Sequence, residues 1–403
     1  MIAVGEIAFV VSLAALFYTF AGYPLLLLVW SKLNIRSNSS DSNAAPLPAV
    51  VVVVVVYNGS ALISKKIETC FGQDYPADKL RILFVSDGSD DDTCAMIKAL
   101  GDPRITLFAM PIRRGKAACL NDAVASVTEE FVVFNDVRQE MHPAAIRQLV
   151  KNFSDPEVGA VSGELVFKRD AITDFGESMD AYWRYEKFLR VCESQIDSSI
   201  GVTGAIYALR RALFQKIPTD TILDDLLIPM NVVMQGKRVL FEKTAVAYDS
   251  PSRDIAHERV RKVRTLAGNF QFLFRNGAFL IPWRNRIALQ FFSHKVLRLL
   301  APVSLLAALF SNVLLVIQPP RAAFQEVLVT LLALQLFGYG LALLATAVPR
   351  AGKFLIVRLA MAFLSLNCFV VLGLIEYISN REAHLWKAGA RADSSPGTPH
   401  SNT

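Results

Sequence analysis

The hydrophobic residues of this 403-residue chain gather into two kinds of segment. Long uncharged runs cover Ile7 to Trp30, Leu299–Pro320 and Val327–Pro349, and a shorter run covers Leu359–Ile375. Each of the first three is long enough to cross a hydrocarbon layer about 30 Å thick as a helix, and Arg358 can lengthen the fourth by snorkelling. We therefore expect four membrane-spanning helices, one before and three after a more polar middle region.

Short apolar runs alternate with helical patterns in that middle region. Its expected strands are Val50–Val56, Arg81–Ser86, Ile105–Ala109 and Phe131–Asn135. Helices are expected at Ala61–Phe71, after the second strand as far as Leu100, and at Lys116–Ser126, with later helices at Thr173–Ser194 and Ile255–Phe274. Strands that alternate with helices favour a parallel α/β sheet covered on both faces.

These patterns divide the chain into six parts. A first membrane helix (1–31) and a polar linker (32–48) precede an α/β domain (49–278), which is followed by a segment that mixes aromatic and basic residues (279–296), further membrane helices (297–378) and a polar tail (379–403). The pattern of 279–296 fits an amphipathic helix at the membrane interface, and it fits equally a long helix that packs only on protein.

Basic residues suggest how the chain is oriented in a membrane. Lys32 and Arg36 follow the first apolar run, so the positive-inside rule places the α/β domain in the cytosol. The same rule disfavours an outside location for Arg381, Lys387 and Arg391, which four spans would produce. The number of spans and the side of the C-terminus stay open at this point.

Composition narrows the class of protein. The net charge of +6 comes from basic residues spread along the chain, which fits contact with a lipid surface and gives no sign of nucleic-acid binding. Five cysteines without CxxC spacing and five histidines without metal-ligand spacing are read as structural residues.

Polar residues, two of them acidic, stand at the ends of three expected strands. Asp87-Gly88-Ser89 ends one strand, Asp136 follows another, and Tyr57-Asn58 ends the first. Ligands of parallel α/β sheets bind outside the carboxyl ends of the strands, so three polar strand ends predict a binding site at one edge. Each feature alone also fits a simple turn.

Two further segments add charge. Arg113-Arg114-Gly115-Lys116 precedes a helix, where cations and free backbone N–H groups suit a diphosphate, although a solvated basic loop has the same composition. Asp224-Asp225 opens an apolar helix, where carboxylates can stabilise the helix dipole or abstract a proton.

Taken in order, these segments resemble the membrane-integrated family 2 glycosyltransferases, which include the processive synthases of cellulose, hyaluronan and poly-N-acetylglucosamine. The resemblance covers roughly residues 15 to 300 and rests on Tyr57-Asn58, Val85-Ser-Asp-Gly-Ser89 with Asp91 and Thr93, Arg114-Gly-Lys116 with Leu120-Asn121, Phe134-Asn-Asp136, Gly159-Ala-Val-Ser-Gly163, Gly204-Ala-Ile-Tyr-Ala208 and Leu223-Asp-Asp225.

The resemblance implies a glycosyltransferase A fold with a mixed, Rossmann-like sheet and inversion at the anomeric carbon of a nucleotide sugar, expected to be UDP-linked. It assigns donor contacts to five positions, namely Tyr57, Asn58, Asp87, Lys116 and Arg264. It implies that Asp136 binds Mg²⁺ or Mn²⁺, that Asp225 with Asp224 supplies the general base, and that Gly204 and Arg261 lie near the acceptor.

Two positions depart from the family pattern. The third position of the metal-binding DxD motif is Arg138, so the metal rests on Asp136 and phosphate oxygens alone, or Arg138 partly replaces it. The QxxRW motif of processive synthases corresponds here to Arg261-Lys-Val-Arg264-Thr265, without its glutamine and tryptophan. The aromatic platform for a growing polymer is therefore not evident, and processivity stays open.

The sequence thus predicts a glycosyltransferase of the plasma membrane, such as a bacterial inner membrane, with a cytosolic active site and a glycan or lipid-linked acceptor. Two alternatives remain, a transferase that loads sugar onto a polyprenyl phosphate and a non-catalytic nucleotide-binding partner of a polysaccharide synthase. The sequence identifies neither the sugar, the linkage nor the oligomeric state.

Overall fold

The computed structural model describes residues 2–33, 46–168, 174–250, 255–318, 322–348, 351 and 354–385. The chain forms two compact units. The first comprises Met1–Ser37, Lys168–Ile200 and Ser250–Arg381, and the second comprises Asn38–Phe167, Gly201–Asp249 and Glu382–Thr403.

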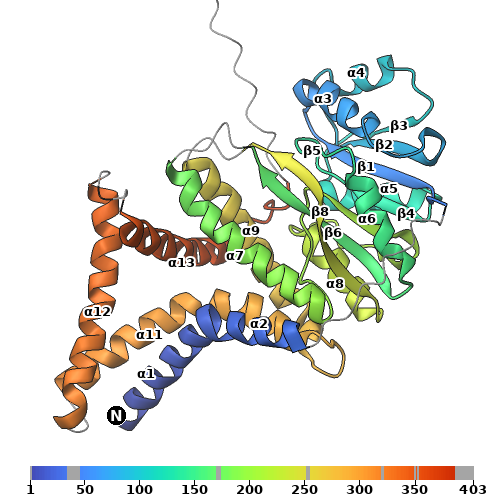
Figure 1. Ribbon diagram of the computed structural model, residues 1–403. Helices are drawn as coiled ribbons and strands as arrows, with labels where there is room; N and C mark the ends of the chain where they lie inside the picture. Colours follow the sequence, from blue (N-terminus) through green and yellow to red (C-terminus); the bar gives the residue numbers. More distant parts are fainter. Residues whose placement is uncertain are drawn as a thin grey trace, which may run out of the picture. The chain divides into compact units, whose positions relative to one another are not determined.

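The second unit is built on an eight-stranded mixed sheet (Figure 1). Its strands are β1 (Val50–Val56), β2 (Leu80–Ser86), β3 (Ile105–Ala109), β4 (Phe131–Phe134), β5 (Glu140–Met141), β6 (Val158–Phe167), β7 (Tyr207–Arg210) and β8 (Arg238–Asp249). They lie in the order β3-β2-β1-β4-β7-β6-β8-β5. The first four are parallel, as predicted, and the sheet becomes mixed where β7 pairs antiparallel with both β4 and β6.

The composition of β1 explains its central place. All seven residues of Val50–Val56 are valine, and all are buried. Branched side chains suit the pleated surface of a strand, and a strand that is apolar on both faces must be covered on both faces. The core beneath it collects Ile63 and Ile67 from a neighbouring helix and Ile146 and Leu149 from another.

Helices cover both faces of this sheet (Figure 1). They are α3 (Ser60–Phe71), α4 (Thr93–Ala99), α5 (Lys116–Ser126), α6 (Ala145–Val150) and α8 (Asp224–Met234), with short 3₁₀ turns at Ala77–Lys79, Lys151–Ser154 and Arg211–Leu213.

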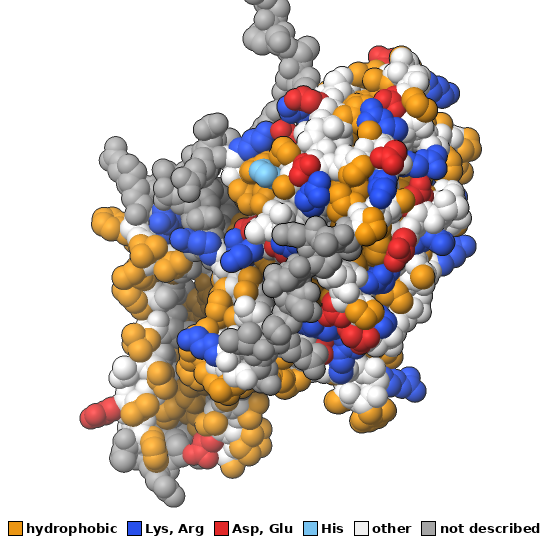
Figure 2. All heavy atoms as spheres, turned by 45° about the vertical axis from the view of Figure 1, so that its right-hand side comes forward, with side chains coloured by type: hydrophobic (Ala, Val, Ile, Leu, Met, Phe, Trp, Pro, Cys, Tyr) orange, Lys and Arg blue, Asp and Glu red, His pale blue; other side chains and the backbone are white. Residues whose placement is uncertain are grey.

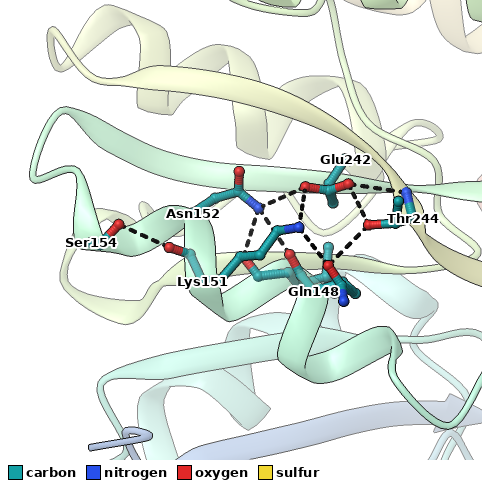
Figure 3. A network of polar contacts seen from close by, with 7 residues as sticks. Gln148, Lys151, Asn152, Ser154, Glu242 and Thr244 are labelled. Carbon is teal, nitrogen blue, oxygen red and sulfur yellow. Dashed lines mark hydrogen bonds and ion pairs between the residues drawn. The ribbon is translucent and has the colours of Figure 1, made fainter. Parts of the chain in front are cut away.

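A polar network ties β8 to the end of α6 (Figure 3). Glu242 accepts from the backbone N–H of Thr244 at 3.0 Å and pairs with Lys151 at 3.2 Å, while the Thr244 hydroxyl bonds Gln148 at 3.0 Å. Partial burial alone would raise the pKa of Glu242, but the Thr244 hydrogen bonds and the Lys151 charge hold it below its usual range.

The first unit is helical. Its elements are α1 (Ile2–Phe17), a π-turn (Tyr18–Gly22), α2 (Tyr23–Leu33), α7 (Asp174–Ile196), α9 (Ile255–Arg275), a 3₁₀ turn (Gly277–Leu280), α10 (Ala288–Phe291), a second π-turn (Phe292–Val296), α11 (Leu297–Ile317), α12 (Ala322–Ala347) and α13 (Leu355–Ser379). Within this unit α1 packs along α11, and α9 packs along α13 (Figure 1).

Four helical stretches among the described residues are long and apolar enough to cross a membrane, as the sequence predicted: Ala3–Leu33, Ala288–Ile317, Phe324–Ala345 and Leu355–Ser379. Figure 2 shows hydrophobic side chains over much of the outer surface of these helices. Val303, Leu314 and Phe337 are 64%, 63% and 63% exposed, which is costly in water and favourable in lipid.

A buried polar cluster holds α2, α7 and α11 together inside the first unit. His294 lies 2.7 Å from Glu193 and 3.1 Å from Glu186, and the Tyr23 hydroxyl donates to Glu193 at 2.8 Å. Arg298 pairs with Glu186. Buried charges are tolerated where each finds partners of this kind.

The structure differs from the sequence prediction in two regions, the predicted α/β domain and the segment that follows it. The predicted α/β domain at 49–278 is divided, because α7 and α9 belong to the helical unit. The expected helix over 279–296 is interrupted as well, since a 3₁₀ turn ends at Leu280 and helical structure resumes only at Ala288–Phe291 and Phe292–Val296. Pro282 lacks an N–H, and the buried Asn285 donates instead to the carbonyl of Phe279 at 2.7 Å, which stabilises a turn.

Candidate active site

The carboxyl ends of β1, β2 and β4 meet at one edge of the sheet. Val56 at the end of β1 pairs with Ser86 at the end of β2, and Phe134 at the end of β4 lies beside Val53. The loops that carry Tyr57, Asp87 and Asp136 therefore leave the sheet on the same side, as the sequence predicted.

The loop after β1 is fixed by the loop after β2. Asn58 has a φ of 49°, its N–H donates to Ser89 Oγ at 3.0 Å, and its side-chain oxygen accepts from the Asp90 N–H at 3.0 Å. The N–H groups of Gly59 and Ser60 donate to Thr93 and Asp91. Asn58, expected to contact the donor, thus shapes the loop that presents Tyr57.

Asp87 has a local role that the sequence did not reveal. Its side chain is fully buried, and its two oxygens accept from the N–H groups of Arg114 at 2.7 Å and Gly115 at 2.9 Å. A carboxylate that accepts two backbone N–H groups fixes a turn strongly. Asp87 therefore anchors the segment that presents Lys116, and its expected contact with a nucleoside stays a prediction.

The turn after β2 packs closely against the backbone of Arg113, whose side chain contacts Tyr57. Gly88 has a φ of +68°, and a Cβ at this position would lie 2.5 Å from the backbone N of Arg113. Only glycine allows this close approach without strain. The Arg113 guanidinium then lies 4.0 Å from the ring centroid of Tyr57, a cation–π contact.

Lys116 connects two of the predicted carboxylates. Its ammonium lies 2.8 Å from Asp136 Oδ1 and 3.1 Å from Asp224 Oδ2. Burial alone would lower the pKa of Lys116, but the carboxylates of Asp136 and Asp224 hold it above its usual range, so the ammonium is charged at neutral pH.

The two residues of the Asp224-Asp225 pair are placed differently. Both lie in the first turn of α8, but Asp224 is only 6% exposed and faces Lys116, whereas Asp225 is half-buried. In the segment that leads to α8, the backbone of Ile217 exchanges hydrogen bonds of 2.8 and 3.0 Å with Asn121 of α5.

Gly204 lies between the two halves of the site. A Cβ at this position would be 3.3 Å from Asp225 Oδ2 and 3.5 Å from Asp136 Oδ2. The structure thus brings Asp136, Asp224, Asp225, Lys116 and Gly204 together, which are five of the positions that the resemblance singled out.

The turn that carries Asp136 is held from two sides by residues that the sequence analysis missed. Lys66, 1% exposed, donates to the side chain of Asn135 and the carbonyl of Gln139. Burial lowers the pKa of Lys66 to about 8. On the other side the buried Asp249 accepts from Gln139 Nε2 at 2.8 Å.

Arg138, at the departing position of the DxD motif, is turned toward this same Asp249. Its Nη2 lies 2.6 Å from Asp249 Oδ2, whose side chain is 1% exposed. In this arrangement Arg138 anchors the turn, while the Asp136 side chain remains 40% exposed.

The C-terminal residues of the second unit also reach this site. His384 Cδ2 would lie 3.1 Å and Leu385 Cδ2 3.4 Å from a Cβ at Gly115. No chemistry was expected of His384, because the histidines show no metal-ligand spacing. Its distance along the chain from Gly115 hides this contact from the sequence.

Two predicted residues belong to the other unit. Arg261 and Arg264 lie on α9, where Arg261 pairs with Glu258 at 2.6 Å. Their expected roles near donor and acceptor stay predictions.

Comparison with known proteins decides the family. The family model for glycosyl transferase family 2 matches residues 51–217, and the model for glycosyl transferase family group 2 matches residues 137–371, which is more than half of the chain. The chain belongs to glycosyltransferase family 2. It is therefore a glycosyltransferase.

Individual members of the family show more distant likenesses. This family 2 glycosyltransferase is 21% identical over 242 residues to a poly-β-1,6-N-acetyl-D-glucosamine synthase of Staphylococcus aureus, covering 59% of this chain and 58% of that protein. It is 28% identical over 177 residues to an N-acetylglucosaminyltransferase of Rhizobium meliloti, covering 43% of this chain and 41% of that protein. The matches thus span less than two thirds of the length of these relatives.

A solved structure matches most of the chain. A mannosyltransferase from Pyrobaculum calidifontis, in complex with GDP-Man and Mn²⁺, superposes with a TM-score of 0.67 at 25% identity, covering 93% of this chain and 99% of that one. The mixed sheet of the second unit is accordingly that of a glycosyltransferase A fold.

The protein side chains at this site could supply only a few ligands to a metal ion, so most of its ligands would come from the substrate and water. Among the described residues no three His, Cys, Asp or Glu side chains are grouped as a protein cage for an ion. Mg²⁺ and Mn²⁺ at diphosphate sites need only one or two carboxylates, and the partly exposed carboxylate of Asp136 would supply one. The residues present therefore fit a divalent ion completed by diphosphate and water.

Proposed function

We propose that this family 2 glycosyltransferase transfers an N-acetylhexosamine from a UDP-linked donor to a hydroxyl of a glycan acceptor, with inversion at the anomeric carbon. The observation that carries the proposal is the grouping of Lys116, Asp136 and Asp225 around the side-chain-free position Gly204. A cation, a metal-binding carboxylate and a second carboxylate are the groups that this transfer needs.

The sugar is proposed from the relatives. Two of them are named for N-acetylglucosamine, whereas the matching solved structure holds GDP-Man. UDP-N-acetylglucosamine is therefore the first donor to test, and GDP-mannose is its direct rival.

We place the nucleotide-sugar donor between Tyr57, at its nucleoside end, and Asp136, at its diphosphate. Tyr57, with Arg113 on its ring, supports the nucleoside. Lys116 turns from its carboxylate partners to the diphosphate, and the first backbone N–H groups of α5, which have no acceptor within the helix, face the same negative charge.

The reaction is a single displacement. Asp225 takes the proton from the acceptor hydroxyl as its oxygen attacks the anomeric carbon, and the bond from that carbon to the diphosphate oxygen breaks. The electron pair leaves with the nucleoside diphosphate, whose growing charge Lys116 stabilises. A divalent ion held by Asp136 would neutralise the same diphosphate oxygens when bound. Attack opposite the leaving group gives inversion.

Asp225 is favoured over Asp224 as the base because of its surroundings. Asp224 is buried and ion-paired with Lys116, while Asp225 is the more exposed of the two. A base must reach the substrate.

The membrane completes the proposal. Four helices of spanning length support an integral protein of the plasma membrane, and Lys32 following the first of them supports a cytosolic catalytic unit.

The experiment is a donor panel with purified full-length protein in detergent or lipid nanodiscs. UDP-N-acetylglucosamine, UDP-glucose and GDP-mannose are supplied in turn with Mg²⁺ or Mn²⁺ and a glycan or polyprenyl phosphate acceptor, and the products are sized. We expect release of UDP with N-acetylglucosamine in a glycan product. Turnover only with GDP-mannose or only onto polyprenyl phosphate would overturn the proposed substrates, and binding without turnover for every donor would indicate a non-catalytic partner.

A further inference from the structure

Tyr207 is a buried side chain beside the proposed site, and the reaction above does not use it. It is the first residue of β7, it pairs with Phe134 on β4, and the two rings stack with centroids 4.7 Å apart. Its neighbour on the other side is Ser162 of β6. Tyr207 thus lies opposite the last residue of β4, directly before the turn that carries Asp136. It also follows Gly204 by three residues.

The hydroxyl of Tyr207 is buried without a hydrogen bond. The residue is 0% exposed, and among the residues that the structure describes no group bonds to its hydroxyl. Folded proteins satisfy most buried polar groups, because an unpaired one loses its water without compensation. A phenylalanine would give the same ring packing without that loss, so packing alone does not explain the hydroxyl.

The negative charges that act on this hydroxyl come from the carboxylates of the proposed site. Burial, and then the negative charges of Asp224, Asp225 and Asp136, raise the pKa of Tyr207 above its usual value, so the hydroxyl keeps its proton and can only donate or accept as a neutral group. Asp224 acts on it most strongly of the three.

Asp224 has a buried acceptor atom that a hydroxyl donor could satisfy. Its Oδ2 is buried and forms no hydrogen bond within the described part of the chain, and its compensation is the ion pair with Lys116 at 3.1 Å. If Lys116 turns to a bound diphosphate, a carboxylate that is only 6% exposed loses its cation. A buried charge in that position needs a new donor.

We propose that Tyr207 is a positioning residue of the donor-bound enzyme: its hydroxyl donates to the Asp224–Asp225 pair when Lys116 moves to the diphosphate. This inference rests on the proposed function. The hydrogen bond holds Asp224 in place and keeps the adjoining Asp225 aimed at the acceptor, while Tyr207 itself touches no substrate.

The test is Tyr207→Phe, which removes one oxygen and keeps the ring stack on Phe134. Because the hydroxyl is unpaired in the free enzyme, the melting temperature is expected to stay unchanged or rise. In the transfer assay we expect kcat to fall about 10- to 100-fold, while KM for the donor and the affinity for nucleoside diphosphate stay within about twofold.

The matched control is Tyr75→Phe. Tyr75 is also buried in the second unit, but its hydroxyl already donates to the carbonyl of Pro48 at 2.7 Å. That variant should melt at a lower temperature and keep its kcat, which is the opposite pattern.

Each outcome decides one question. Absence of turnover in the wild-type protein would refute the proposed function, whereas wild-type kcat in Tyr207→Phe would refute only this inference. A drop in melting temperature as large as that of Tyr75→Phe would show that the hydroxyl is already bonded in the free enzyme, and a raised donor KM with unchanged kcat would show a direct donor contact. Either result would overturn the positioning role.

Discussion

The ammonium of Lys116 lies 2.8 Å from the carboxylate of Asp136, although Lys116 begins α5 and Asp136 follows β4. The same ammonium reaches Asp224 at 3.1 Å, so one cation joins the side proposed to hold the diphosphate to the side of the proposed base. A diphosphate can take over this cation, which would couple donor binding to the arrangement of the carboxylates.

Lys116→Met should weaken nucleoside diphosphate binding at least tenfold, since a charge-assisted contact to phosphate is lost. It also leaves the buried Asp224 without its cation, which should lower the free energy of unfolding by about 1–3 kcal/mol. Calorimetric titration and thermal unfolding measure the two effects. Lys98→Met, which removes an exposed lysine on α4, is the control and should change neither.

Gly204→Ala should remove most of the transfer activity without unfolding the protein. The new methyl group would lie 3.3 Å from Asp225 Oδ2 and 3.5 Å from Asp136 Oδ2, in the space that an acceptor or a metal-bound water needs. Steady-state kinetics should show a loss of at least about tenfold in kcat/KM. Gly277→Ala, where a Cβ meets nothing within 4 Å, should behave like the wild type, and an active Gly204→Ala would show that this space is not used.

Arg138→Gln separates the two explanations of the altered DxD motif. Because Arg138 is bound to Asp249 at 2.6 Å, the variant should lose stability but keep its dependence on Mn²⁺ concentration. Activity is measured across a Mn²⁺ titration, with unfolding followed in parallel. A higher Mn²⁺ requirement in the variant would instead indicate that Arg138 partly replaces the metal.

Glu242 should contribute to stability in a pH-dependent way. Its pKa is lowered in the folded protein, so its contribution is present above the unfolded value of about 4.5 and is lost as the pH falls through the folded value. Glu242→Gln should therefore be less stable than the wild type near neutral pH and approach it in acid. Glu68→Gln, at an exposed carboxylate, is the control in the same melting curves; a constant difference across pH would contradict the assignment.

The elements that carry strong local patterns could be predicted from the sequence. Val50–Val56 is apolar at every position, and the parallel order of the first four strands follows from their alternation with helices. The four spanning helices follow from length and composition. The site residues Asp136 and Asp225 could be proposed because each stands at the start or end of such an element.

The remainder depends on contacts between distant parts of the chain. Lys66 looks like an exposed helix residue until α3 is placed under the 135–139 turn, and Tyr207 looks like an ordinary strand residue until β7 is paired with β4. The grouping of α7 and α9 with the membrane helices and the turn at Asn285 likewise follow from tertiary packing and side-chain hydrogen bonds. Local periodicity contains no information about tertiary packing or about side-chain hydrogen bonds.

The most direct measurement of the central claim compares wild-type protein with Asp225→Asn in two assays, transfer from UDP-N-acetylglucosamine in the presence of Mn²⁺ and binding of UDP by calorimetry. Asp90→Asn, which alters an exposed carboxylate, serves as the control. If Asp225 is the general base, the variant binds UDP with wild-type affinity and loses at least about 100-fold in kcat. Wild-type turnover in Asp225→Asn would contradict the account.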